Sequence, residues 1–221
     1  MRILYKFPSR SRFQKMLNAC DNIKKMSASN DYHIMLTLDT DDESIDNISL
    51  RDYIQENGNI SAIFGKSLNK IHAINRNLDE APQFDILVCM SDDMEFIQHG
   101  FDNVIREAFG SNLDQFIHFN DGNQKSNLCT MSIMGVDYYN RFKYIYHPDY
   151  KSLWCDMEAT EVSKILGKYK YMGDHVNIVR HNHPAWGLAQ YDAQYQKTES
   201  KDMWNHDEQV YLRRKANNFD L

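Results

Sequence analysis

The chain has only four cysteines and no apolar segment of membrane-spanning length. The cysteines are widely spaced, without a CxxC pair: Cys20, Cys89, Cys129 and Cys155. This spacing argues against zinc knuckles and against a disulfide framework, so we expect reduced thiols. No apolar run approaches the roughly 18 residues of a spanning helix, and "MRILYKFPSR" begins as a strand without a long apolar signal segment. We therefore expect a soluble protein of the cytoplasm.

An excess of basic charge is also missing. The net charge is −6 and the sequence pI is about 5.8, so no overall basic field favours tight, non-specific nucleic-acid binding. Repeats, low-complexity segments and linkers rich in proline, glycine or serine are absent, so no firm domain boundary is marked. With 42% hydrophobic and 25% charged residues, the composition is that of a folded protein. We expect one large α/β domain with a C-terminal appendage.

What is present is an alternation of strand-like and helix-like segments. Apolar runs of strand length recur at residues 3–7, 33–38, 60–64, 86–90, 116–119 and 128–134. Apolar residues at helical spacing fall between them, at residues 13–26, 68–78 and 101–109. Such an alternation implies right-handed crossovers and a mainly parallel sheet with helices on both faces.

Three further helices are expected outside this alternation. Residues 39–59 are polar and contain a loop followed by a short helix at 48–57. A helix opened by Asp156 closes at Gly167, and residues 207–218 form the last helix. The tail from Trp186 onward is polar and rich in tyrosine. The second half of the chain is thus the less regular one.

Charged loops follow three of the predicted strands: "YKFPSRSRF" the first, "LTLDTDD" the second and "VCMSDDM" the fourth. In an open parallel sheet, ligands collect at the carboxyl ends of strands, where helix N-termini and loop amides converge. A helix cap, an exposed charge or a solvated loop would explain each loop taken alone. Together they predict one crevice suited to a divalent cation and substrate phosphates. The crevice would be lined by Arg10, Arg12, Asp39, Asp41, Asp42, Asp92 and Asp93.

The first half resembles the nucleotide-sugar half of GT-A fold glycosyltransferases of the family 2 type. Besides the charged loops, "FGKSLNKIHAINRNL" and "FDILVCMSDDM" carry the resemblance, which puts Ser91, Asp92 and Asp93 at the metal-binding DxD position. The resemblance implies that Asp93 binds a divalent metal, Mn²⁺ or Mg²⁺, and that Asp92 contacts the ribose. A strict DxD begins with an aspartate, and Ser91 departs from that pattern.

The second half resembles the same family. "YKSLWCDMEATEVSKILGK" is similar to the segment that brings a catalytic carboxylate to the head of a helix, which implies Asp156 as general base with Glu158 as the second candidate. "HNHPAWG" resembles the late histidine motif, which implies that His181 or His183 completes the metal shell. The plainer explanations are a helix N-cap, a first-turn acid and a surface turn.

The resemblance covers about residues 2–187 and implies a single catalytic domain at 1–187. Its nucleotide-sugar half is 1–95, its acceptor and catalytic half is 96–187, and residues 188–221 form a tail or lid. Lys66 and Lys70, four residues apart, are expected on one helical face, where solvation is the plainer explanation. The donor-binding candidates are Pro8, Ser9, Arg10, Arg12, Asp39, Asp41, Lys66, Lys70 and Asp92, and those of the acceptor or sugar side are Asp121, Trp154 and Trp186.

The function that the resemblance implies is metal-dependent transfer of a sugar from a nucleotide diphosphate donor, with a UDP-sugar favoured, to an acceptor hydroxyl with inversion. A nucleotidyltransferase is the enzymatic alternative, but those usually carry a glycine-rich phosphate loop after the first strand, and "KFPSRSRF" has no glycine. A nucleotide-sugar or glycan-binding module without catalysis is the other alternative. Glycan, lipid-linked, small-molecule and protein acceptors stay open, whereas the acidic charge weighs against a modified DNA base.

Overall fold

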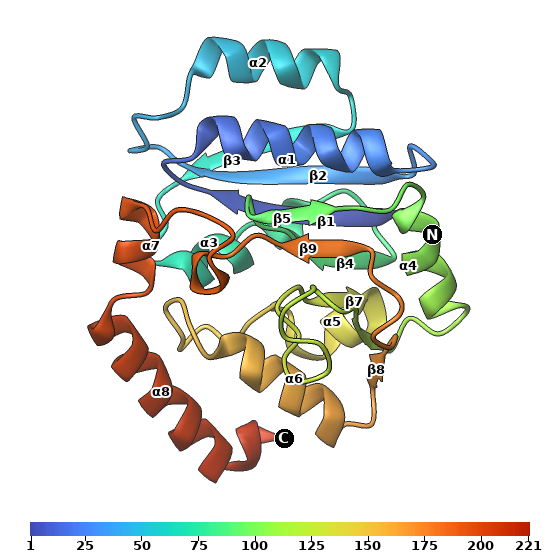
Figure 1. The fold of residues 1–221 in the computed structure, drawn as a ribbon, viewed down its shortest axis with the longest axis vertical. Helices are drawn as coiled ribbons and strands as arrows, with labels where there is room; N and C mark the ends of the chain where they lie inside the picture. The colour runs from blue at the N-terminus through green and yellow to red at the C-terminus, as the bar shows by residue number, and fades with distance from the viewer.

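Seven strands form the central sheet of the chain, whose computed structural model describes residues 1–221 (Figure 1). Their order across the sheet is β3-β2-β1-β4-β7-β6-β8. Only β7 runs antiparallel to its neighbours, β4 and β6, so the predicted mainly parallel sheet is confirmed. The strands span Ile3–Ser9 (β1), Tyr32–Asp39 (β2), Ile60–Gly65 (β3), Ile86–Cys89 (β4), Phe116–His118 (β6), Ile133–Gly135 (β7) and Tyr169–Tyr171 (β8).

A second sheet has two short antiparallel strands, Met94–Phe96 (β5) and Val179–His181 (β9). In its register Met94 lies opposite His181. The pairing therefore places the residue that follows the DxD position beside the first histidine of the late motif.

All six predicted strands are present, but the segment 128–134 is a strand only from Ile133. The strands β5, β8 and β9 were not expected. Each has three residues, which is too short for an alternating pattern to stand out. These three are held by partners far away in the sequence.

Eight α-helices complete the fold. The helix at 13–26 forms as predicted, whereas the last helix begins at Lys201, six residues before the expected start, because the Ser200 side chain caps it through the N–H of Met203. The helices span Phe13–Met26 (α1), Asn47–Glu56 (α2), Lys70–Asn75 (α3), Phe101–Phe109 (α4), Val136–Phe142 (α5), Cys155–Ile165 (α6), Ala193–Thr198 (α7) and Lys201–Ala216 (α8).

The helix predicted at 68–78 is shorter than expected. It ends at Asn75, and Asn77 has a left-handed backbone (φ 63°) that leads into a 3₁₀ turn at Leu78–Glu80. Lys66 precedes the helix, in the loop after β3. The expectation that Lys66 and Lys70 share a helical face is therefore wrong.

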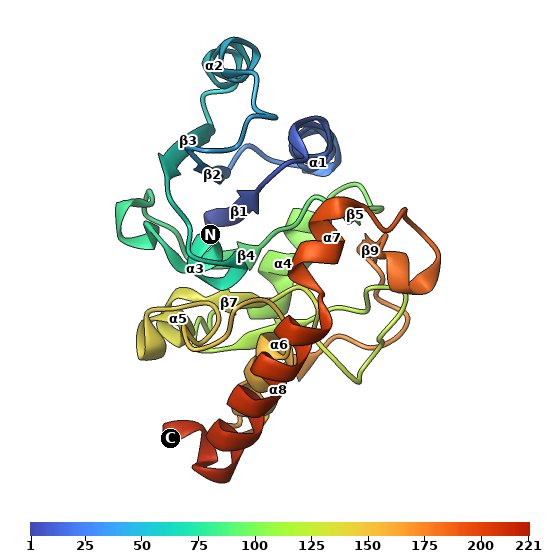
Figure 2. The ribbon, with the colours of Figure 1, turned by 90° about the vertical axis from the view of Figure 1, so that its left-hand side faces the viewer.

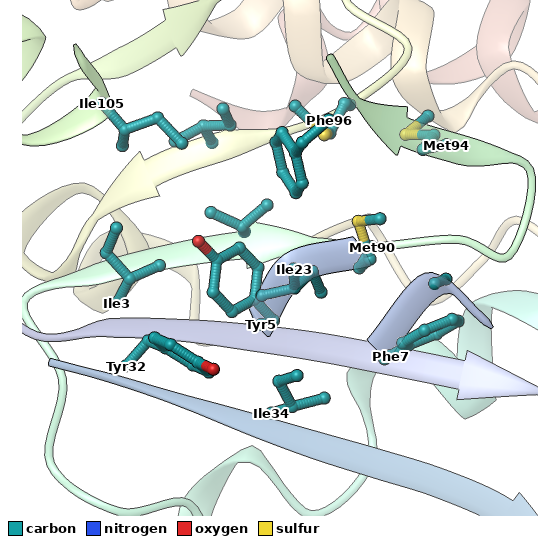
Figure 3. Close-up of a cluster of buried hydrophobic side chains, with 14 of the residues drawn as sticks. Ile3, Tyr5, Phe7, Ile23, Tyr32, Ile34, Met90, Met94, Phe96 and Ile105 are labelled. Carbon is teal, nitrogen blue, oxygen red and sulfur yellow. The ribbon is translucent and has the colours of Figure 1, made fainter. Parts of the chain in front are cut away.

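Helices cover both faces of the sheet, as predicted, and each face has its own core. Figure 2 shows α1 and α3 on opposite sides of β1. Alternate residues of β1 supply the two cores: Ile3, Tyr5 and Phe7 pack with α1, α4 and β5, as Figure 3 shows, whereas Leu4 packs with α3 and α5. Both ends of the chain contribute to the α3 side, because Phe219 belongs to that core.

The C-terminal helix α8 is part of this packing. Its buried residues Asp207, Val210, Tyr211 and Arg214 follow helical spacing and face α6 and the segment before it. None of the helices combines the length and the apolar composition that a membrane crossing needs.

Candidate active site

The charged loops after β1, β2 and β4 meet at the carboxyl edge of the sheet. Arg10, which follows β1, donates to Asp39 Oδ2 at the end of β2 (2.6 Å) and to Asp41 Oδ1 (2.7 Å). Arg12 donates from Nη1 to Asp92 Oδ1 (3.0 Å) beyond β4. Pro8 and Ser9 are the last residues of β1 and pair with β2. These ion pairs bring together charged residues from all three loops.

Three side chains at this edge could hold a metal ion. Asp93, His181 and His183 each offer one ligand atom, and these atoms lie within 4.8 Å of one another. The β5–β9 pairing explains their convergence, because the N–H of Asn182 donates to the carbonyl of Asp93 (2.7 Å). Carboxylate and imidazole ligands together suit Mn²⁺, whose site chemistry tolerates both.

His181 lies between two carboxylates. Its Nε2 is 3.4 Å from Asp93 Oδ2, and its Nδ1 is 3.6 Å from Asp121 Oδ2. Burial alone would lower the pKa of His181, but the two carboxylates raise it to about 9. Burial alone would raise the pKa of Asp93, but the contact with His181 holds that pKa well below the usual range. A divalent cation would take the place of the proton on Nε2.

Asp121 was expected on the acceptor side, but it faces the far nitrogen of His181. The N–H groups of Asn123 and Gln124 and the hydroxyl of Thr130 donate to its carboxylate at 2.7–2.9 Å. The Nδ1 atom of His181 is buried and has no hydrogen-bond partner, since 3.6 Å is too long for one. At this distance the carboxylate of Asp121 acts on His181 through its charge, which helps to raise the pKa of the imidazole.

The two carboxylates of "SDD" have different surroundings. Burial raises the pKa of Asp92 despite the nearby guanidinium of Arg12, whereas the pKa of Asp93 is lowered. Ser91, the residue that departs from a strict DxD, donates its hydroxyl to Asp93 Oδ1. Ser91 is therefore a hydrogen-bond donor that supports the carboxylate of Asp93.

The C-terminal segment closes over these residues. Arg12 donates to both carboxylate oxygens of Asp192 (2.7 and 3.1 Å), and its guanidinium lies 3.9 Å from the centre of the Tyr195 ring. The Tyr195 hydroxyl donates to Asp93 Oδ2 (2.7 Å). His183, which could ligate the metal, has its Nε2 2.8 Å from Glu199. Sequence reasoning did not single out Asp192 or Tyr195, because both lie in a tail without an evident motif.

Asp156 lies in the first turn of α6, but it is not the N-cap. The helix begins at Cys155, and the cap residue is Trp154, which has a left-handed backbone (φ 61°) and no side-chain cap. Asp156 Oδ1 accepts the N–H of Met157 (2.9 Å). Burial raises the pKa of Asp156, and the charges of Lys70 and, more weakly, His181 oppose this shift. The predicted base thus lies within electrostatic reach of the candidate metal ligands.

Glu158, the second candidate for the base, is occupied by other partners. Arg214 Nε donates to Glu158 Oε2 at 2.8 Å and the Tyr150 hydroxyl donates to the same oxygen at 2.7 Å, and all three residues are buried. This ion pair ties α6 to α8. Of the two candidate carboxylates, only Asp156 lacks a cationic hydrogen-bond partner.

The aromatic candidates lie at different places. Trp154 packs edge to face against Trp204 of α8, with ring centres 5.2 Å apart. Trp186 is half exposed in the 3₁₀ turn Pro184–Trp186, which follows His183 directly. Both tryptophans thus neighbour a candidate catalytic or metal-binding residue in the sequence.

Arg76 and Lys6 were missed by sequence reasoning. Arg76 donates to the carbonyl of Leu38 (2.7 Å), lies 3.8 Å from Asp39, and passes so close to Gly65 that a Cβ there would come within 2.7 Å of it. Lys6 is fully buried and donates from Nζ to the carbonyl of Arg76 (2.7 Å). The glycine that ends β3 was the one available signal for this close approach.

Solved glycosyltransferases share this architecture. The mannosyltransferase PcManGT from Pyrobaculum calidifontis, in complex with GDP-Man and Mn²⁺, aligns with 84% of this chain at 13% identity and a TM-score of 0.65. S. aureus TarS 1–349 in complex with UDP-GlcNAc aligns with 81% at 9% identity and a TM-score of 0.63. The chain has the GT-A fold.

The likeness is one of fold, since the identities are low. No protein-family model and no curated protein sequence matches the chain. The alignments cover 59% of PcManGT and 58% of TarS 1–349, so the chain spans less than two thirds of the length of either structure.

Proposed function

We propose that the chain is a metal-dependent glycosyltransferase that moves a sugar from a nucleotide diphosphate to an acceptor hydroxyl. The observation that carries the proposal is the cluster of Asp93, His181 and His183 at the carboxyl edge of the sheet. Arg12 is paired with the adjacent Asp92, and the half-buried carboxylate of Asp156 lies within electrostatic reach of His181. The GT-A fold of the solved glycosyltransferases supports the same assignment by analogy.

Asp93, His181 and His183 would hold Mn²⁺ or Mg²⁺. The ion would offset negative charge on the leaving diphosphate. Two imidazoles favour Mn²⁺, because Mg²⁺ prefers an all-oxygen shell. In this role the charge of Asp121 acts on His181, and Ser91 steadies the carboxylate of Asp93.

The donor would lie across the loops after β1, β2 and β4. Pro8, Ser9, Arg10, Asp39 and Asp41 line the nucleoside side. Arg12, with Lys66 and Lys70, supplies positive charge for the diphosphate, and Asp92 contacts the ribose or sugar. A UDP-sugar is the favoured donor. PcManGT was solved with GDP-Man and TarS with UDP-GlcNAc, so both nucleotides belong in the test.

Asp156 would accept the proton of the acceptor hydroxyl as the new bond forms, which makes the reaction inverting. Burial raises its pKa, which makes the carboxylate a stronger base. Trp154 and Trp186 would contact the sugar or acceptor. The acceptor itself is a hydroxyl of a glycan, a lipid-linked glycan or a small molecule. Four unpaired, buried cysteines fit the cytoplasm, which we propose as the location.

Residues 188–199 would act as a lid, because Asp192 and Tyr195 contact Arg12 and Asp93. The rest of the proposed tail, α8, is held by buried contacts and would not move with the lid.

A thermal-shift screen of UDP, GDP and CDP and of their sugars, with and without Mn²⁺, tests the proposal. The correct nucleotide at 100 times its Kd should stabilise the protein by about 2.7 kcal/mol, which corresponds to roughly 5–10 °C for a chain of this size. The shift should need Mn²⁺ and should vanish in Asp93→Asn.

The matched control is Asp52→Asn, which removes an exposed carboxylate on α2 and should leave the shift intact. If no nucleotide shifts the wild type, or if the shift is the same without metal, the proposal is wrong. If a nucleotide sugar does bind, its hydrolysis separates an enzyme from a binding module.

A further inference from the structure

A buried carboxylate of the C-terminal helix holds the loop that precedes the proposed base. Asp207 of α8 is fully buried. Its oxygens accept three consecutive backbone N–H groups, from Lys151 (2.9 Å), Ser152 (2.8 Å) and Leu153 (2.7 Å). His206 completes the set, with Nδ1 2.8 Å from Oδ1. One side chain thus satisfies three consecutive N–H groups of a partly buried turn.

The Asp207 contacts clamp the loop at residues 151–154, which is not held by its own side chains. The hydroxyl of Ser152 and the indole nitrogen of Trp154 are buried without hydrogen-bond partners. Trp154 also has a left-handed backbone, which is strained for a residue with a Cβ atom and persists only when the surroundings impose it. Those surroundings come from α8: besides the Asp207 contacts, Trp204 and Tyr211 pack on the Trp154 ring, each with a centre distance of 5.2 Å.

The clamp acts three to five residues before Asp156. Helix α6 starts directly after Trp154, and its cap residue provides no side-chain hydrogen bond to the first turn. The direction of that turn therefore depends on the loop at 151–154. The carboxylate of Asp207 is buried and its contacts are all with groups of the protein, so it does not touch substrate.

We propose that Asp207 is a positioning residue, which clamps the backbone at 151–153 so that α6 presents Asp156 to the acceptor hydroxyl. The inference rests on the proposed role of Asp156. The proposal gives α8 a role in the acceptor half, although α8 lies outside residues 2–187, which the family resemblance covers. A displacement of about 1 Å at a reacting group can cost a hundredfold in rate, so the clamp matters for turnover.

The first variant is Asp207→Asn, which has nearly the same shape but turns an amide N–H₂ toward backbone N–H groups. We expect hydrogen exchange at residues 150–157 to become at least about tenfold faster. Turnover of the nucleotide sugar identified by the thermal-shift screen, with water as acceptor, should fall at least about tenfold in kcat. The KM for that donor and the Mn²⁺-dependent thermal shift should stay at wild-type values, because the donor contacts lie on other loops.

Two companions complete the experiment. Asp202→Asn removes an exposed carboxylate of the same helix and should change neither readout. Asp207→Glu keeps the charge, and it should restore part of both the exchange protection and kcat. If Asp207→Asn does not fold, the glutamate variant carries the test, with a reduced kcat and an unchanged donor KM expected.

The outcomes are distinguishable from failure of the proposed function. Unchanged exchange at 150–157 overturns the clamp whatever the chain's activity. Faster exchange with an unchanged kcat, or a kcat loss matched by a loss of donor affinity, overturns the positioning role and leaves the glycosyltransferase proposal intact. A wild type that neither binds nor turns over any nucleotide sugar refutes the function, and the positioning role falls with it.

Discussion

At the scale of single residues, the adjacent carboxylates Asp92 and Asp93 differ in pKa because they have different partners. Burial raises the pKa of Asp92 beside Arg12, while His181 keeps Asp93 ionised. Two neighbouring carboxylates with different pKa values can take different roles, one as metal ligand and one as a contact to the donor. The sequence predicted the pair and its chemistry from the strand that precedes it. It placed Arg12 in the same crevice, and the resemblance implied that His181 or His183 joins Asp93 at the metal. The individual contacts could not be predicted, because Arg12 and His181 lie 80 and 88 residues away from Asp92 and Asp93 in the sequence.

The role of Asp156 is testable by Asp156→Asn. The variant should keep donor binding but lose sugar transfer by at least about 100-fold, since a well-placed base contributes about 10²- to 10⁴-fold. In the wild type, kcat should fall as the pH drops through the pKa of this carboxyl, which burial raises from its ordinary value. Donor turnover with water as acceptor measures both effects. Asp137→Asn, at an exposed acid in the first turn of α5, is the matched control; wild-type turnover in Asp156→Asn would refute the assignment.

Lys6 carries a titratable amine where the fold leaves no water. Burial lowers its pKa to about 7, helped by the charge of Arg76. A neutral amine has two N–H groups, which match its two acceptors, the hydroxyl of Thr37 and the carbonyl of Arg76. Through Arg76 the amine supports the end of β2 and the carboxylate of Asp39.

This burial gives Lys6→Met a defined pH dependence. Between about pH 7 and 10.5 the unfolded chain binds a proton on Lys6 that the folded chain lacks, so the wild type gains stability as the pH rises. Relative to Lys6→Met, that gain amounts to at most about 1.4 kcal/mol per pH unit. Urea denaturation at pH 7, 8 and 9 measures it, with Lys25→Met as the exposed control. A constant difference between wild type and Lys6→Met would show that the amine stays charged in the folded protein.

At the scale of helices and strands, the apolar periodicity of the sequence determined which elements could be predicted. The helix at 13–26 and the strands β1 to β3 are long enough for a clear apolar pattern, and they lie where the sequence places them. Helices α5 and α7 have seven and six residues and were not predicted. The strands β5, β8 and β9 were missed for the same reason, although β5 and β9 assemble the candidate metal site. Short elements are decided by distant partners, which a single sequence does not reveal.

Helix α7 should be released when its anchor is removed. Asp192 both caps α7, through the N–H groups of Gln194 and Tyr195, and binds Arg12. Losing a cap costs about 1 kcal/mol, and the ion pair is lost with it, so Asp192→Ala should make residues 188–199 more sensitive to a broad-specificity protease.

In the wild type, Mn²⁺ with the matching nucleotide should slow cleavage of this segment, as a lid that orders over a donor would. Asp202→Ala in α8 serves as the control. Equal cleavage rates with and without nucleotide would count against a lid.

At the scale of the whole molecule, the two halves expected from the sequence share both cores. The core on the α1 side contains Ile3 and Val179, and the core on the α3 side contains Leu4 and Phe116. The sheet likewise runs through both halves without interruption. The fold class could be predicted because strand and helix alternation is a local pattern. The place of the C-terminal helix could not, because its anchors, Asp207 and Arg214, are single charged residues that look solvent-exposed in sequence.

The ion pair between Glu158 and Arg214 tests how firmly α8 belongs to this unit. Both side chains are buried, and Arg214 also binds Asp220 and the carbonyl of Phe219. Removing one partner of such a pair leaves a buried charge alone, which costs about 3–5 kcal/mol. We expect Arg214→Met to lose that much in urea denaturation, a large part of the roughly 5–15 kcal/mol that holds a domain together.

The double variant Glu158→Met with Arg214→Met should recover most of this loss, since apolar side chains can replace a buried pair. Secondary structure and tryptophan fluorescence should report a single transition in wild type and in the double variant, because α8 shares a core with the sheet. An early separate transition of α8, or a cost below about 1 kcal/mol as at a surface ion pair, would show that the helix is an appendage. In that case Asp207 could not impose a backbone geometry on the loop before Asp156, so this measurement also bears on the clamp.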